Sequence, residues 1–173
     1  FSCIALKKKV GLSSVYATFN TPVSPSKLSS QEKLHLLKLA EETDFKLYRF
    51  KKSERILPRI QKVMGILKGL YFETLLDVGS GRGAFLFPFM DEFPQVSVKS
   101  VDILEERITF LSDMVCGGVD GLEVKKADIC QMPFPEKSVD VVTLLEVLEH
   151  IPDVEKAIAS SVRIAKSYVV LTV

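Results

Sequence analysis

The spacing of apolar and polar positions changes near residue 73. Before that point apolar residues recur at helical intervals, which predicts an amphipathic helix over 54–68 that ends at Gly69. The apolar positions of this helix are Ile60, Val63, Met64 and Leu67. Ser29, followed three residues later by Glu32, has the spacing of a capping box and predicts an earlier helix over 30–44.

After residue 73 the pattern alternates between short apolar runs and amphipathic stretches. The runs predict strands over 74–78, 96–102, 122–127, 139–145 and 168–173. The stretches between them predict helices over 83–91, 104–115 and 153–165. Strands that alternate with helices through short links indicate an α/β fold, a Rossmann-like, mostly parallel, doubly wound sheet. The last predicted strand coincides with the end of the chain, so we expect the natural protein to continue with further strands.

Charge divides the chain into two regions. Residues 1–72 hold 14 Lys and Arg against 5 Asp and Glu, which gives a net charge of +9. Since the whole chain has a net charge of +1, residues 73–173 have a net charge of −8. We therefore predict a basic, partly helical N-terminal extension over 1–52 and a core domain over 53–173. The extension could contact a polyanion such as RNA, or it could dock on the acidic core.

Composition narrows the protein class. The chain is 47% hydrophobic and 26% charged, which is ordinary for a globular protein. No apolar stretch approaches the ~20 residues that span a bilayer, so we expect no membrane association. The chain has three widely spaced cysteines, which form neither a disulfide framework nor a zinc motif. Reduced thiols predict a cytoplasmic protein.

A glycine-rich segment, Asp77-Val78-Gly79-Ser80-Gly81-Arg82-Gly83, follows the first predicted strand of the core. Glycine suits a turn there because it accepts positive φ and lets a ligand approach the backbone. Such turns at the carboxyl end of a parallel strand bind nucleotide-like ligands. Gly79-x-Gly81-x-x-Ala84 fits a dinucleotide fingerprint, with Asp102 at the distance of a ribose contact.

The same segment also reads D-x-G-x-G-x-G and resembles motif I of the class I S-adenosylmethionine-dependent methyltransferases, over about 100 residues from Asp77 onward. The resemblance implies that Asp77 lies near the ammonium and sulfonium of S-adenosyl-L-methionine. It also implies that Asp102 binds the ribose hydroxyls, that Ile103 packs on adenine, and that Asp128 accepts from the adenine amino group. The full set of cofactor-binding residues that it implies is Asp77, Gly79, Ser80, Gly81, Gly83, Asp102, Ile103, Asp128, Ile129 and Glu146.

Each carboxylate also has a structural interpretation. Asp102 could cap the following helix, and Asp128 could form a turn. Three acids after three successive strands, all at the ligand-binding edge, favour a joint role in binding.

The fourth predicted strand is followed by Glu146-Val147-Leu148-Glu149-His150. In a helical turn Glu146, Glu149 and His150 would share a face and could hold Mg²⁺ or Mn²⁺. This E-x-x-E-H pattern resembles the small-RNA 2′-O-methyltransferases, where it binds metal, and the ubiquinone-type O-methyltransferases. Alternatively, Glu146 lines the cofactor pocket, Glu149 is solvated and His150 caps or packs. A further alternative is that His150 is a general base, since the ordinary pKa of histidine is near neutral. We predict Glu146 and His150 as the catalytic residues.

These features predict an S-adenosylmethionine-dependent methyltransferase that acts on a small-molecule acceptor. The alternatives are an RNA methyltransferase, with metal-dependent ribose 2′-O-methylation as one form, and a non-catalytic, cofactor-binding partner subunit. A dinucleotide-dependent oxidoreductase is a more distant fourth hypothesis.

Overall fold

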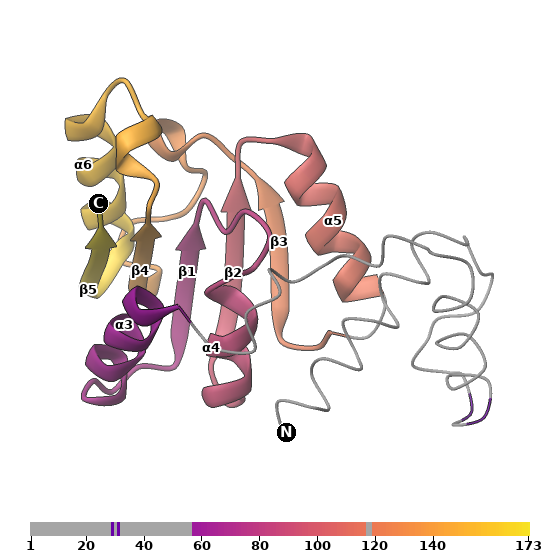
Figure 1. Cartoon of the computed structure of the whole chain (residues 1–173). Helices are drawn as coiled ribbons and strands as arrows, with labels where there is room; N and C mark the ends of the chain where they lie inside the picture. The colour runs from indigo at the N-terminus through magenta and orange to yellow at the C-terminus, as the bar shows by residue number, and fades with distance from the viewer. Residues whose placement is uncertain (1–28, 30, 32–56, 117–118) are drawn as a thin grey trace.

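The computed structural model describes residues 29, 31, 57–116 and 119–173. Its centre is one five-stranded sheet of order β3-β2-β1-β4-β5, in which every pair of neighbouring strands is parallel (Figure 1). The strands are β1 (Thr74–Val78), β2 (Ser97–Asp102), β3 (Leu122–Lys126), β4 (Val139–Leu145) and β5 (Ala165–Thr172). The sheet winds outward in both directions from β1, so the predicted doubly wound α/β fold is confirmed.

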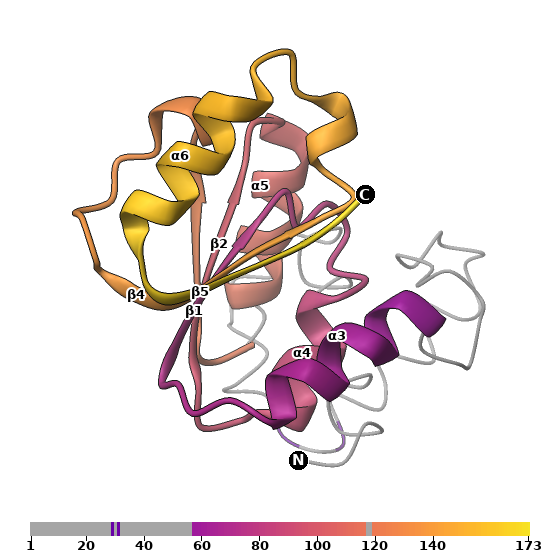
Figure 2. The ribbon, with the colours of Figure 1, turned by 90° about the vertical axis from the view of Figure 1, so that its left-hand side faces the viewer.

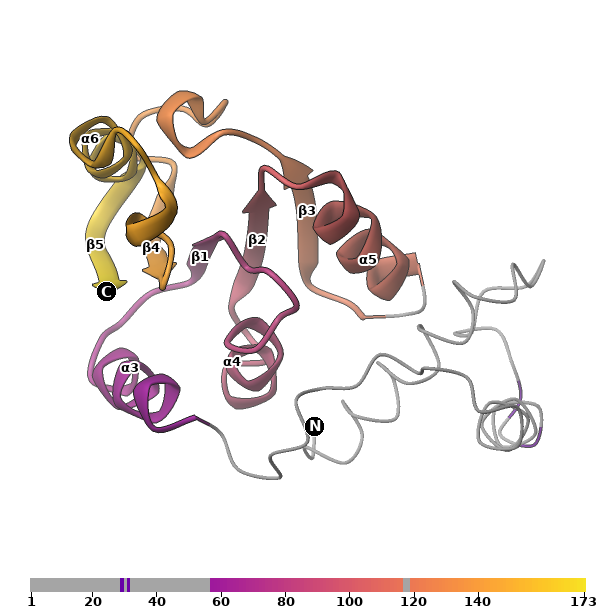
Figure 3. The same cartoon turned by 45° about the horizontal axis from the view of Figure 1, so that its top comes forward.

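Helices cover both faces of the sheet. They are α3 (Pro58–Lys68), α4 (Leu86–Glu92), α5 (Glu105–Cys116) and α6 (Val154–Ile164), with short 3₁₀ turns η2 (Ile129–Gln131) and η3 (Leu148–His150). Helices α3, α4 and α5 lie on one face and α6 on the other (Figures 2 and 3). None of the helices in the described ranges has the length and apolar character needed to cross a membrane.

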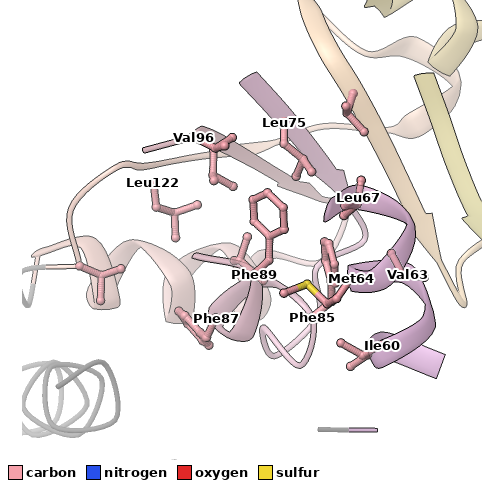
Figure 4. Close-up of a cluster of buried hydrophobic side chains, with 14 of the residues drawn as sticks. Ile60, Val63, Met64, Leu67, Leu75, Phe85, Phe87, Phe89, Val96 and Leu122 are labelled. Atoms are coloured by element: carbon pink, nitrogen blue, oxygen red, sulfur yellow. The ribbon is translucent and has the colours of Figure 1, made fainter. Parts of the chain in front are cut away.

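Alternating side chains of β1 build a separate core on each face. Leu75 packs with residues of α3, α4 and α5, whereas Leu76 packs with residues of α6 and η2. Figure 4 shows the first cluster, in which Phe89 of α4 lies between Leu75 and Met64 of α3. The four apolar positions predicted for the 54–68 helix are all buried, at 0–6% exposure, which confirms that amphipathic face.

Most predicted elements agree with the structure to within a few residues, and β1 and β4 agree at both ends. Helix α4 begins at Leu86 rather than at residue 83, because Gly83 has φ +75°, outside the helical region. Strand β5 begins at Ala165, directly after α6, rather than at residue 168. Gly69 ends α3 as predicted, although with φ −86°. The predicted helix over 30–44 and the extension over 1–52 lie outside the described residues, apart from residues 29 and 31.

Asp140 joins three strands at the amino-terminal edge of the sheet. Its carboxylate accepts hydrogen bonds from the backbone N–H of Glu73 at 3.0 Å, and from the N–H and hydroxyl of Thr74 at 2.9 and 2.8 Å. Lys166 of β5 lies 3.1 Å from its other oxygen. Burial alone would raise the pKa of Asp140, but these donors outweigh burial and lower the pKa to about 2.

Candidate functional site

The glycine turn at the end of β1 has a backbone that only glycine adopts without strain. Gly79, Gly81 and Gly83 have φ values of +70°, +54° and +75°. A Cβ atom on Gly79 would lie 2.6 Å from Cγ2 of Val147, and one on Gly83 would overlap the ring of Phe87. The Gly79 N–H donates to the carbonyl of Val101 at 2.8 Å, which ties the turn to β2.

Asp77 is the buried carboxylate beneath this turn. It is 2% exposed, and its Oδ1 accepts a hydrogen bond from the Thr143 hydroxyl at 2.8 Å. Burial raises the pKa of Asp77 to about 6, against the lowering effect of the Ser80 and Thr143 hydroxyls. The nearby charge of Asp102 adds to the increase. A carboxylate in this state gains from the approach of a cation, which would stabilise its charged form.

A second set of hydroxyls fixes the turn itself. Ser100 in β2 is fully buried and donates to the Ser80 hydroxyl at 2.7 Å. Ser80 in turn donates to the backbone carbonyl of Asp77 at 3.2 Å. The loop is therefore held to both β1 and β2 by side chains.

A small pocket of about 100 Å³ opens beside Asp77, between α3 and the carboxyl ends of β1, β4 and β5. The polar side chains on its wall include two carboxylates, Asp77 and Glu146, and one guanidinium, Arg59. Ile60, Val63 and Phe85 supply apolar walls. The pocket thus combines both signs of charge in a partly apolar setting.

Glu146 has a strained backbone with φ +58°, which is uncommon for a residue with a side chain. Its Oε1 accepts from the hydroxyl of Thr172 at 3.1 Å, and its Oε2 lies 3.8 Å from a guanidinium nitrogen of Arg59. Its backbone N–H is directed toward Thr172 of β5 as well. These contacts hold the carboxylate at the pocket wall, and such strain is common at functional sites.

Asp102 ends β2 on the other side of the glycine turn. Its two carboxylate oxygens accept from the backbone N–H groups of Gly81 at 3.2 Å and Leu104 at 3.0 Å. A carboxylate has about four acceptor positions, so two remain for other donors. Ile103 and Leu104, which follow, are 60% and 51% exposed. The sequence therefore places a carboxylate and two exposed apolar side chains together at this edge.

Asp128 and Ile129 follow β3 and are more peripheral. Asp128 is exposed, and its Oδ1 accepts from the N–H of Cys130 at 2.8 Å, as in the turn-forming alternative. The side chain of Ile129 is 8% exposed and packs in the core on the α6 face. Neither residue lines the pocket beside Asp77.

The structure does not support the predicted metal site at Glu146, Glu149 and His150. Only Leu148–His150 forms a 3₁₀ turn, and Glu146 precedes it in a left-handed conformation, so the three side chains do not share one helical face. Glu149 and His150 are exposed, whereas Glu146 is directed into the pocket wall. Among the described residues no group of three or more His, Cys, Asp or Glu side chains is placed to hold a metal ion.

Two contributors to the site were not assigned to it from sequence. Arg59 belongs to the basic region 1–72 of the sequence, and its guanidinium lies at the pocket beside Glu146. Thr143 was read as part of an apolar strand. The signal available was its polarity within the run Val139–Leu145, since an interior hydroxyl needs a partner.

Comparisons with known proteins agree with this geometry. The model of the methyltransferase domain family matches residues 76–172, more than half of the chain. The chain is 28% identical over 120 residues to ribosomal RNA small subunit methyltransferase G of Leuconostoc mesenteroides, covering 67% of this chain and 48% of that protein. It is 32% identical over 133 residues to sterol 24-C-methyltransferase of Pneumocystis carinii, covering 72% of this chain and 34% of that protein. The chain thus spans less than half of the length of these curated relatives.

A solved structure shares the fold. Phospholethanolamine N-methyltransferase 2 of Haemonchus contortus, solved with phosphomonomethylethanolamine and S-adenosylhomocysteine, superposes with a TM-score of 0.58 at 24% identity. The match covers 64% of this chain and 27% of that one. The family match and the common fold confirm the resemblance drawn from the glycine turn: the chain belongs to the methyltransferase domain family of the class I S-adenosylmethionine-dependent methyltransferases.

Proposed function

We propose that this chain is the cofactor-binding core of an enzyme that transfers a methyl group from S-adenosyl-L-methionine to a small molecule. The observation that carries the proposal is the glycine turn with a buried acid, Asp77, on one side and Asp102 on the other. Both carboxylates lie at the carboxyl ends of adjacent parallel strands, where ligands of open α/β sheets bind.

The pocket beside Asp77 suits the amino-acid end of the cofactor. Methionine carries an ammonium and a carboxylate on one carbon, so a matching site needs both signs of charge within a few ångströms. Arg59 would bind the carboxylate, and Asp77 and Glu146 would receive the ammonium. The 3.8 Å pair between Arg59 and Glu146 would open as the ligand enters, with each partner taking a ligand group in its place.

The nucleoside end would lie on the other side of the turn. Asp102 has free acceptor positions for the two ribose hydroxyls, and Ile103 is exposed where it could pack on adenine. Asp128 and Ile129 would flank the far edge of the adenine, with Asp128 accepting from its amino group. The backbone of Gly79, Ser80, Gly81 and Gly83 would border the ligand between these two ends.

When bound, the cofactor supplies an electrophilic methyl group on a sulfonium. The chain would contribute by holding the acceptor in line with that group and by excluding water. A hydroxyl acceptor must also lose a proton, and His150, exposed just beyond the end of β4, would accept it. Glu146 would hold the reactive end of the cofactor in register with the acceptor.

The charge of the core favours a small, neutral or cationic acceptor. The ligand-binding edge carries Asp102, Asp128, Glu146, Glu149 and Asp153, within a region of net charge −8. Phosphate groups would be repelled there. RNA remains the alternative, because residues 1–72 carry +9 and one relative is named as a ribosomal RNA methyltransferase.

Ligand binding is tested by calorimetry with S-adenosylhomocysteine and, separately, with NAD. We expect the first to bind and the second not to. Asp102→Asn should weaken S-adenosylhomocysteine about tenfold, as expected for a lost hydrogen bond to a charged group. Glu136→Gln, an exposed acid in a loop away from the site, is the matched control and should bind like the wild type. Preference for NAD would overturn the proposal in favour of an oxidoreductase.

Acceptor class is tested with methyl-labelled S-adenosylmethionine, in separate reactions with small amines and alcohols and with RNA. Transfer to a small molecule supports the proposal. Transfer to RNA alone, with binding that weakens steeply as salt rises, supports the alternative. Cofactor binding without transfer to any acceptor would instead support a partner subunit.

A further inference from the structure

Three polar residues form a row across the middle of the sheet, in a setting that is otherwise apolar. Ser100, Asp77 and Thr143 occupy paired positions on β2, β1 and β4, so their side chains lie on the same face. All three are nearly inaccessible, at 0%, 2% and 0% exposure. A buried hydroxyl without a partner is costly, so each member of the row must be bonded to something.

Thr143 meets this requirement by bonding to the Asp77 carboxylate. Its hydroxyl has one hydrogen, and Oδ1 of Asp77 at 2.8 Å is a closer acceptor than the carbonyl of Leu76 at 3.4 Å. Its neighbours on β4, Val142 and Leu144, are fully buried and apolar. A valine would fill the same space without a polar atom. The hydroxyl, rather than the volume, is therefore what distinguishes this position.

We propose that Thr143 is a positioning residue for the cofactor: its hydroxyl holds Oδ1 of Asp77 and leaves Oδ2 to receive the ligand ammonium in the pocket. Thr143 does not line that pocket and acts only through Asp77. The inference rests on the proposed function. It adds Thr143 of β4, a buried residue outside the pocket, to the residues that determine affinity for the cofactor.

The charged groups around Asp77 determine how this contact would be detected. Asp102 at the end of β2 raises the pKa of Asp77, whereas Ser80 and Thr143 lower it. Glu146, after β4, and Arg59 of α3 line the same pocket as Asp77. Removing the Thr143 hydroxyl removes one of the two hydroxyls that favour the carboxylate, so the pKa of Asp77 should rise. The charged form is the one that binds an ammonium, so affinity should then develop at higher pH.

The test compares Thr143→Val, which keeps the shape, with Thr143→Ser, which keeps the hydroxyl. Affinity for S-adenosylhomocysteine, which carries the same ammonium, is measured by calorimetry from pH 5 to 8. Thr143→Val should bind about tenfold more weakly at pH 7, the effect of losing one hydrogen bond to a charged group. The midpoint pH, at which half of the rise in affinity with pH has occurred, should move to a higher value. Thr143→Ser should restore most of the affinity and return the midpoint toward that of the wild type.

Ser161→Ala is the matched control. This residue is also a fully buried hydroxyl, but it lies on α6 at the opposite face and donates to the carbonyl of Ala157 at 2.8 Å. It should leave both affinity and midpoint unchanged. If Thr143→Val does not fold, Thr143→Ala provides a second variant without the hydroxyl.

The ¹³C shift of the Asp77 carboxyl, followed by NMR during titration without ligand, gives a second reading. The inference is overturned if wild type and Thr143→Val bind equally well at every pH, or if the titration of Asp77 is the same in both. Failure of the wild type to bind S-adenosylhomocysteine at any pH would instead refute the proposed function, and the inference with it.

Discussion

Asp77 and Asp140 are carboxylates on the neighbouring strands β1 and β4, yet their surroundings shift their pKa values in opposite directions. Asp140, at the amino-terminal edge, has hydrogen-bond donors from Thr74 of β1, from Glu73 just before β1 and from Lys166 of β5, and its pKa falls to about 2. Asp77, at the carboxyl-terminal edge, is more deeply buried and its pKa rises to about 6.

The difference between the two is the number of donors that the protein itself supplies. At Asp140 the donors complete the hydrogen bonding of the carboxylate, so its negative charge stabilises the junction of three strands. At Asp77 two neutral hydroxyls, those of Thr143 and Ser80, lower the pKa, but burial outweighs them and the charge is poorly compensated. One edge of the sheet thus gains stability from its acid, whereas we propose that the acid at the other edge binds a cationic ligand. Four experiments test this contrast.

The largest effect should come from Asp77→Asn. Losing the carboxylate should weaken S-adenosylhomocysteine about 100-fold, because a charge-assisted contact worth about 3 kcal/mol disappears. The free energy of unfolding at pH 7 should stay the same or increase, because a buried charge is removed. Calorimetry and urea unfolding measure the two quantities. A clear loss of stability with intact binding would show that Asp77 is a structural acid like Asp140.

Asp140→Asn should have the opposite outcome. We expect it to lower the free energy of unfolding by about 1–2 kcal/mol, the value of a pKa lowered by nearly two units, reduced for partial solvent screening. Affinity for S-adenosylhomocysteine should remain within about twofold of the wild type, well below the tenfold change that 1.4 kcal/mol produces. The same two measurements apply. Weakened binding without a change in stability would break the contrast.

The pH dependence of stability should separate the two acids. Asp140 has a lowered pKa, so its stabilisation is complete above about pH 4 and is lost as pH falls toward 2. Asp77 has a raised pKa, so its ionisation destabilises the fold as pH rises from about 4 to 6. Urea unfolding at pH 3, 5 and 7 gives the free energy of unfolding at each pH. Between pH 5 and 3 this free energy should change less in Asp140→Asn than in the wild type, and between pH 5 and 7 it should change less in Asp77→Asn.

Lys166→Met should have the smallest effect. Lys166 is one of several partners of Asp140 and is about half exposed, so its removal should cost no more than about 1 kcal/mol. Urea unfolding at low and high salt is the check, because the cost should shrink as salt screens the pair. A loss as large as that of Asp140→Asn would mean that the ion pair, rather than the backbone donors, holds the strands.

The sequence was sufficient to predict the helices and strands of the core but not the residues that line the pocket. The strands at 74–78 and 139–145 were predicted at both ends because near-continuous apolar runs are typical of strands that are buried on both faces. The helical face of α3 followed from its spacing. Arg59 at the pocket could not be deduced, because it depends on how α3 lies against β5. The E-x-x-E-H segment misled for a related reason: its helical spacing assumed a helix, whereas Glu146 adopts φ +58° and only three residues turn.

Helix α3 also sets a limit on where this domain can be cut. The family match begins at residue 76, within β1, so a boundary drawn from it would leave α3 out. Yet Leu67 of α3 is fully inaccessible, and Met64 and Val63 pack against the same cluster as Leu75 and Phe89. A fragment that starts at residue 74 would lack α3 and Arg59. The apolar cluster that α3 covers, including Leu75 and Phe89, would then be exposed to water. We expect such a fragment to aggregate, and recombinant work on this domain should therefore start no later than Leu57.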